Sequence, residues 1–123
     1  MVINLGLARS GDWEGVLAEI RAVKESCKGR ILKVIIEACN FTREEKIALC
    51  RVVAMSGADF IKTSTGTASG GASVEDVKLF REYISPDTRI KAAGGIRTFE
   101  QAQAMLEAGA DRLGASNLVA LAK

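Results

Sequence analysis

The sequence predicts an α/β protein with a parallel sheet, and three features of the 123-residue chain support this prediction. Short apolar segments alternate with longer amphipathic ones. No hairpin signal joins successive apolar segments, so each must connect to the next through a crossover that contains a helix. Glycine-containing turns follow three of the apolar segments, where the carboxyl ends of the strands are expected.

The alternation defines about five βα units. The strands are expected at residues 1–5, 30–39, 58–65, 88–92 and 111–115, and the helices at residues 12–27, 42–57, 73–84 and 98–108. Asp12 can cap the first helix. Thr42 and Glu45 provide a capping-box start to the second helix, which ends near Gly57.

Two parallel-sheet architectures fit this alternation. An open doubly wound sheet carries helices on both faces, whereas a (β/α)8 barrel needs eight units and usually about 200 residues or more. One face of successive strands mixes polar with apolar side chains, which favours a barrel interior that opens onto an active site. These faces are formed by Lys33, Ile35, Glu37 and Cys39, by Phe60, Lys62 and Ser64, and by Arg89, Lys91 and Ala93.

Composition excludes several classes of protein. A hydrophobic content of 48%, a charged content of 26% and a single proline are typical of one globular domain and not of a disordered chain. The net charge of +2 is interspersed along the sequence, which argues against nucleic acid and membrane surfaces as partners. The sequence has no apolar run of the roughly 20 residues that span a bilayer, and no signal-peptide pattern. We therefore expect a cytoplasmic protein.

The titratable residues limit the possible chemistry. The chain has no histidine, and its three cysteines lack CxxC spacing, so we expect no metal site. Catalysis would then depend on lysine, carboxylate or hydroxyl groups.

Two lysines stand alone in apolar strand segments, each just before a glycine-containing turn. Lys62 and Lys91 are 29 residues apart, about one strand-helix-strand step, which would place them on neighbouring parallel strands. If their ammonium groups lay roughly 6 Å apart at an effective dielectric of about 20, repulsion would be about 3 kcal/mol, or about 2 pKa units. A neutral amine near pH 7 is a nucleophile, so the leading hypothesis is a Schiff-base enzyme.

A structural role is the alternative for each lysine. Lys62 and Lys91 could sit at strand ends with their ammonium groups in solvent. Lys33, on the preceding strand segment, could form an ion pair with Glu37.

Glycine turns follow the lysine strands at residues 66–71 and 94–95, and a further turn lies at residues 114–117. Backbone N–H groups exposed by glycine, or at a helix N-terminus, favour a phosphate group. Barrel enzymes often build phosphate sites from their last two βα loops. Each turn could instead be a simple connection, and neither GxGxxG nor GxxxxGK is present.

Four segments match one known family in order and spacing. They are LKVIIE at residues 32–37, ADFIKTSTG at 58–66, IKAAGGIRT at 90–98 and GAS at 114–116. On these segments the chain resembles the deoxyribose-phosphate aldolase family over essentially its whole length, and it corresponds to the family's C-terminal portion.

The resemblance implies a (β/α)8 TIM-barrel class I aldolase, a lyase of deoxyribonucleotide catabolism. Such an enzyme reversibly cleaves 2-deoxy-D-ribose 5-phosphate to acetaldehyde and D-glyceraldehyde 3-phosphate, without a metal or other cofactor. The resemblance implies that Lys62 forms the Schiff base, that Lys91 lowers the pKa of Lys62, and that Lys33 belongs to the group that contacts substrate and relays protons. Around the phosphate it places Gly66, Gly94, Gly95 and Ser116.

The match begins at the family's fourth strand. We therefore expect residues 1–123 to form a single partial barrel, strands 4 to 8, that lacks three N-terminal βα units. The family's catalytic aspartate, just before the strand that matches residues 1–4, is absent, and Asn117 stands where many relatives have serine. An open sheet exposes apolar surface and unpaired edges, so we expect a homo-oligomer or completion by a separate N-terminal chain.

Three hypotheses of function follow. The first is an aldolase that retains at least imine formation on Lys62. The second is a truncated or degenerate relative that folds, self-associates or binds phosphate without turnover, and the missing aspartate favours it for full turnover. The third is another lysine Schiff-base barrel enzyme, such as a transaldolase-like protein, which the sequence contexts of Lys62 and Lys91 disfavour.

Overall fold

The computed structural model describes residues 1–64, 72–94, 96 and 98–114 of the chain. Its elements are α1 (Leu5–Arg9), α2 (Trp13–Ser26), β1 (Lys33–Ile35), the 3-10 helix η1 (Ala38–Asn40), α3 (Arg43–Ser56), β2 (Phe60–Lys62), α4 (Val74–Tyr83), β3 (Arg89–Ala93), α5 (Phe99–Ala108) and β4 (Arg112–Gly114). The described helices include none with the length and apolar character of a membrane span.

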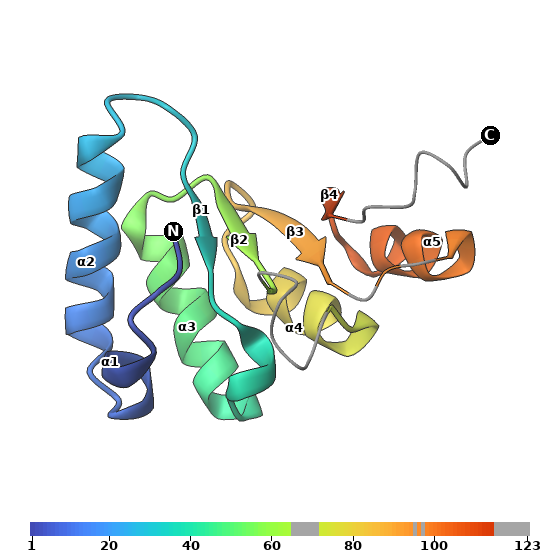
Figure 1. Ribbon diagram of the computed structural model, residues 1–123, viewed down its shortest axis with the longest axis horizontal. Coiled ribbons are helices and arrows are strands. Elements are labelled where there is room, and N and C mark those ends of the chain that lie inside the picture. The colour runs from blue at the N-terminus through green and yellow to red at the C-terminus, as the bar shows by residue number, and fades with distance from the viewer. Residues whose placement is uncertain (65–71, 95, 97, 115–123) are drawn as a thin grey trace.

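The four strands form one parallel sheet in the order β1-β2-β3-β4. Helices α2, α3, α4 and α5 pack each against the next in a layer beside the sheet (Figure 1). Val34, Ile61 and Ile90 share one row of the sheet and are fully buried. Each such side chain contributes about 1.5–3 kcal/mol on burial. The predicted α/β class with a parallel sheet is confirmed.

The helix boundaries agree with the predicted caps. The Asp12 carboxylate accepts the Gly15 N–H at 2.9 Å, at the start of α2. Thr42 and Glu45 form the reciprocal capping box of α3, and Gly57 ends that helix at φ +83°.

The strand expected at residues 1–5 was wrong in its extent. Val2 forms only an isolated parallel bridge to Ile35. The Asn4 side chain then accepts the Leu7 N–H and caps α1, a helix that the sequence did not predict. The cap ends the extended segment because asparagine at an N-cap favours the helix that follows.

The strand expected at residues 30–39 is also shorter than predicted. It ends at Ile35, and Glu37 adopts left-handed φ/ψ of 49° and 60° before η1 begins. A left-handed residue interrupts the alternation of side chains between two faces. The prediction that Glu37 and Cys39 continue the face of Lys33 was therefore wrong.

Two aspartates join the amino ends of neighbouring strands. Asp59, just before β2, accepts the N–H of Leu32 at 2.8 Å and binds Lys24 Nζ at 2.7 Å. Asp111, just before β4, accepts the N–H of Ile90 at 2.9 Å and lies 3.6 Å from Arg81 Nη1. Each carboxylate thus links a strand to the preceding strand and to a helix of the outer layer.

Candidate active site

The register of the sheet places the two predicted lysines side by side. Lys62 of β2 pairs with Lys91 of β3, and the row continues to Ile35 on β1 and Arg112 on β4. Residues paired in a parallel sheet point to the same face. Both lysines are partly buried rather than fully in solvent. The prediction that they lie on neighbouring parallel strands is confirmed.

Phe60 organises the next row toward the amino ends, which consists of Lys33, Phe60 and Arg89. The Phe60 side chain is buried. Lys33 Nζ lies 5.3 Å from its ring centroid, and the guanidinium carbons of Arg89 and Arg112 lie 6.0 and 5.8 Å from it. Cations are attracted to aromatic faces at such distances. Three cations of this sheet face therefore lie around one ring. We call this face the inner face, and it includes Lys33, Phe60, Lys62, Arg89, Lys91 and Arg112.

Electrostatics distinguish Lys91 within the inner face. The pKa of its ammonium group is lowered from the ordinary lysine value, chiefly by burial and then by the positive charges of Lys33 and Lys62. Arg112 adds a smaller repulsion. Burial and like charges both disfavour a protonated amine. The crowding of cations expected from the lysine spacing is therefore present at Lys91.

The ion pairs of the described residues lie away from the lysine pair. They join Lys24 to Asp59, Lys46 to Asp76 at 2.6 Å, and Arg81 to Asp111. Within residues 1–64, 72–94, 96 and 98–114, no carboxylate forms an ion pair with Lys33, Lys62 or Lys91. The alternative Lys33–Glu37 ion pair is not among the salt bridges of the described residues; Glu37 leaves the strand in the left-handed conformation.

One of the predicted phosphate glycines can be placed. Gly94 follows β3 with φ +86°, and its carbonyl oxygen accepts the Ala72 N–H at 3.0 Å. Gly66, Gly95 and Ser116 lie outside the described residues. The helices that begin nearby are capped by their own side chains, Ser73 for α4 and Thr98 for α5.

Sequence reasoning missed two residues at this site. Arg112 shares the lysine row and lowers the pKa of Lys91, and its position two residues into the fifth expected strand could have indicated this. Thr63 is fully buried, and its hydroxyl bonds to the backbone of Ala93 on β3. No sequence signal indicates a side-chain bond between two strands.

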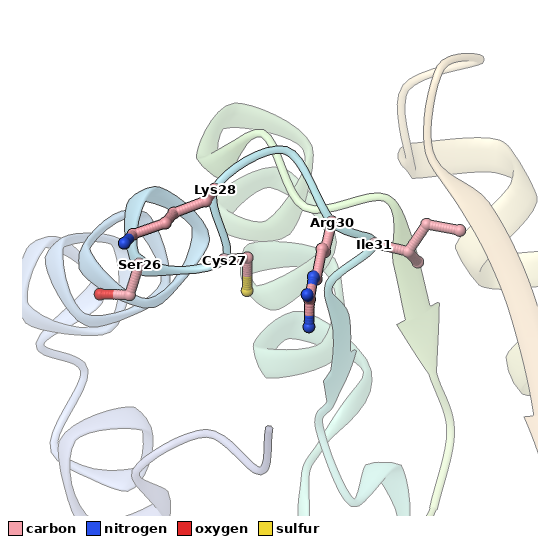
Figure 2. Close-up of a pocket in the computed structure, with 5 residues that line it drawn as sticks. All are labelled: Ser26, Cys27, Lys28, Arg30 and Ile31. Atoms are coloured by element: carbon pink, nitrogen blue, oxygen red, sulfur yellow. The ribbon is translucent and has the colours of Figure 1, made fainter.

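A separate pocket of about 650 Å³ lies in the turn between α2 and β1. It is lined by Ser26, Cys27, Lys28, Arg30 and Ile31. Figure 2 shows the Lys28 and Ile31 side chains pointing in opposite directions, so the lining groups do not converge on one point. This pocket contains none of the residues that the sequence nominated for chemistry.

Comparison with known proteins gives one family. Residues 1–121 match the family model described as DeoC/LacD family aldolase. The deoxyribose-phosphate aldolase of Clostridium botulinum (strain Eklund 17B) is 51% identical over all 123 residues, which align with 56% of its length.

Solved structures give the same result. The deoxyribose phosphate aldolase from Aeropyrum pernix, described as having a unique tetrameric structure, is 32% identical with a TM-score of 0.81. The match covers 89% of this chain and 48% of that one. The aldolase QR15 is 37% identical with a TM-score of 0.91, over 98% of this chain and 55% of its own. The chain thus spans about half the length of the relatives it matches.

Proposed function

Because the chain belongs to the DeoC/LacD family of aldolases, we propose that it carries the Schiff-base chemistry of a deoxyribose-phosphate aldolase. Its parallel sheet is part of the (β/α)8 barrel of these enzymes. The proposed reaction is reversible cleavage of 2-deoxy-D-ribose 5-phosphate to acetaldehyde and D-glyceraldehyde 3-phosphate. The observation that carries the proposal is the pairing of Lys62 with Lys91 in register on a face rich in cations.

Lys62 is the proposed nucleophile. In the direction of synthesis its neutral amine attacks the carbonyl carbon of acetaldehyde, and water leaves to give an iminium ion. The iminium withdraws electrons from the neighbouring carbon, which loses a proton to give an enamine. The enamine attacks the carbonyl carbon of glyceraldehyde 3-phosphate, and water then hydrolyses the product iminium to release Lys62.

Lys91 is the proposed partner of the nucleophile. Two ammonium groups in register repel each other, so a charge on either lysine disfavours a charge on the other. The lowered pKa of Lys91, caused first by burial and then by the charges of Lys33 and Lys62, supports this repulsion. The coupling favours a neutral amine in the pair, which nucleophilic attack requires.

The phosphate of the substrate is assigned to the carboxyl ends of the strands. There we propose contacts from the turns that contain Gly66, Gly94, Gly95 and Ser116. Lys33, on the same face as the lysine pair, would contact the substrate and relay protons. The chemistry assigned to these residues needs no metal or other cofactor.

A second candidate function is assembly or phosphate binding without turnover. The observation in its favour is that the inner face is only partly covered, since Lys33, Lys62 and Lys91 are each partly exposed. We propose that residues 1–123 form one partial-barrel domain that pairs with copies of itself through this face. Light scattering after gel filtration should then give a mass above that of one chain, and a monodisperse monomer would contradict self-association.

Reductive trapping tests the aldolase proposal. The chain is incubated with acetaldehyde and cyanoborohydride, and the intact mass is compared with that of Lys62→Ala and of Lys78→Ala, a control at an exposed lysine on α4. We expect one preferred adduct that is lost only with Lys62→Ala. Adducts that are equal in all three chains would contradict Schiff-base chemistry on Lys62. Release of acetaldehyde from 2-deoxyribose 5-phosphate then separates full turnover from imine formation alone.

A further inference from the structure

The backbone leaves the regular sheet at Thr63, the residue after Lys62. The Thr63 N–H donates to the carbonyl oxygen of Lys91 on β3 at 3.1 Å, whereas its own carbonyl oxygen accepts the Ala38 N–H beyond β1 at 2.9 Å. In a regular parallel ladder, the N–H and C=O of one residue bond to the same neighbouring strand. The peptide after Thr63 has therefore turned from β3 toward β1, and it no longer offers Ala93 a ladder acceptor.

The Thr63 hydroxyl takes the place of that acceptor. Its Oγ1 accepts the Ala93 N–H at 3.0 Å and donates to the Ala93 carbonyl oxygen at 3.1 Å. Thr63 is 0% exposed and Ala93 is 4% exposed. Neither backbone group of Ala93 can turn to water, so the hydroxyl is their available partner.

This contact connects the two parts of the proposed site. Ala93 lies two residues after Lys91 and directly before Gly94, whose carbonyl oxygen binds the Ala72 N–H at the entry to α4. A shift of Ala93 away from Thr63 would therefore move the end of β3, its lysine and the glycine turn together.

We propose that Thr63 is a positioning residue that holds Lys62 and Lys91 in register and orients the Gly94 turn. Whether this positioning affects catalysis depends on the proposed function. Thr63 acts through the backbone of β3, and no contact between its side chain and substrate is involved.

The test compares three variants of the full chain. Thr63→Val has nearly the same shape and lacks the hydroxyl, whereas Thr63→Ser keeps the hydroxyl. Thr88→Val is the matched control, because Thr88 is 3% exposed and lies at the opposite end of β3. Two quantities are measured: the pKa of Lys91 from NMR titration of labelled lysine side chains, and the pH profile of acetaldehyde trapping on Lys62.

We expect Thr63→Val to raise the pKa of Lys91 toward the ordinary lysine value, since displacement of β3 separates the ammonium groups and exposes them. The trapping profile should move to higher pH, with about a tenfold slower reaction at pH 7 for each unit of the move. Thr63→Ser and Thr88→Val should leave both quantities unchanged.

Three results would overturn the proposal: a folded Thr63→Val chain with an unchanged Lys91 titration, a Thr88→Val chain with the same shift as Thr63→Val, or a Thr63→Ser chain with a shifted titration. If Thr63→Val does not fold, the serine variant decides, because it must fold and titrate like the unaltered chain. If the unaltered chain traps no acetaldehyde, only the proposed function is contradicted. The NMR titration of Lys91 still tests the positioning role of Thr63, because it does not depend on trapping.

Discussion

The two ends of the same four strands are built in opposite ways. At the amino ends, the carboxylates of Asp59 and Asp111 each bind a backbone N–H of the preceding strand and face a cation from a helix. Toward the carboxyl ends, Lys62 and Lys91 pair in register without an ion pair to a carboxylate of the described residues. Stabilising contacts thus join the strands at their amino ends, whereas the residues proposed for catalysis lie toward the carboxyl ends, as is general for (β/α)8 barrels.

The amino-end arrangement is repeated within the chain. A Gly-Ala-Asp sequence occurs at residues 57–59 and again at 109–111. In both, the glycine has positive φ after a helix and the alanine is buried. The aspartate then binds the neighbouring strand. The same three residue types therefore form the helix-to-strand connection at both places.

The largest stability effect is expected at the amino end. Asp59→Ala should lower the free energy of unfolding by about 2 kcal/mol, because the Leu32 N–H, in a residue only 5% exposed, loses its acceptor. Urea denaturation measures the change. Asp59→Asn keeps an acceptor and should lose less, and Asp87→Ala, at an exposed residue, should lose little. Equal losses for Asp59→Ala and Asp87→Ala would contradict the role of the carboxylate.

The two Gly-Ala-Asp connections should differ in their tolerance of a side chain. A Cβ atom at Gly109 would lie 2.9 Å from Arg81 Cγ, whereas the nearest atom at Gly57 would be 3.9 Å away. Both glycines have positive φ, so each alanine variant carries backbone strain and the comparison between them isolates the contact with Arg81. Gly109→Ala should therefore destabilise the chain by about 1 kcal/mol more than Gly57→Ala in the same denaturation assay. A larger loss at Gly57 would contradict this account.

Removal of a charge toward the carboxyl ends of the strands should increase the free energy of unfolding, whereas the changes at the amino ends decrease it. Lys91→Met should stabilise the chain at pH 7 by up to about 1 kcal/mol, since it removes a partly buried cation beside Lys33 and Lys62. The folded chain binds this proton less tightly than the unfolded chain, so the stability of the unaltered chain rises with pH between the lowered pKa and about 10.4. The advantage of Lys91→Met should shrink over that window. Lys78→Met, at an exposed lysine, is the control. A loss of stability in Lys91→Met at pH 7 would contradict the claim that the charge of Lys91 destabilises the folded chain.

The smallest effect is the pH dependence of the amino end. The Lys24 ammonium and the Leu32 N–H hold the pKa of Asp59 below its ordinary value. A lowered carboxyl pKa contributes stability that is present above the unfolded value of about 3.9 and is lost as the pH falls through the folded value. The difference in stability between the unaltered chain and Asp59→Asn should therefore be constant near pH 6 and decrease below about pH 4. If the difference in stability between the unaltered chain and Asp59→Asn grows as the pH falls, the lowered pKa of Asp59 is contradicted.

Local features of the fold were predictable from the sequence, whereas its tertiary details were not. The caps at Asp12 and Thr42 depend on residues within one turn of each helix, and both formed as predicted. The 29-residue spacing of Lys62 and Lys91 equals about one crossover, which predicted that they lie on neighbouring strands. Their pairing in register is a finding of the structure. The early end of β1 depends on the left-handed conformation of Glu37, which its residue type does not favour.

The parts of the site that the sequence did not predict share one physical cause, because each depends on how separate strands are placed. The gathering of Lys33, Arg89 and Arg112 around Phe60 requires the register of four strands. The bond from Thr63 to Ala93 requires the backbone to turn away from β3. Neither the register of separate strands nor such a turn is encoded in the period of a single segment.

The central claim is that the amine of Lys62 is activated by its place beside Lys91. Peptide mass spectrometry of the unaltered chain, treated at pH 7 with limiting acetaldehyde and cyanoborohydride, measures the rate of ethylation at each lysine. We predict that Lys62 reacts ahead of every other lysine, including the exposed Lys78. Ethylation of Lys62 no faster than that of Lys78, or preferred ethylation of Lys91, would contradict the claim.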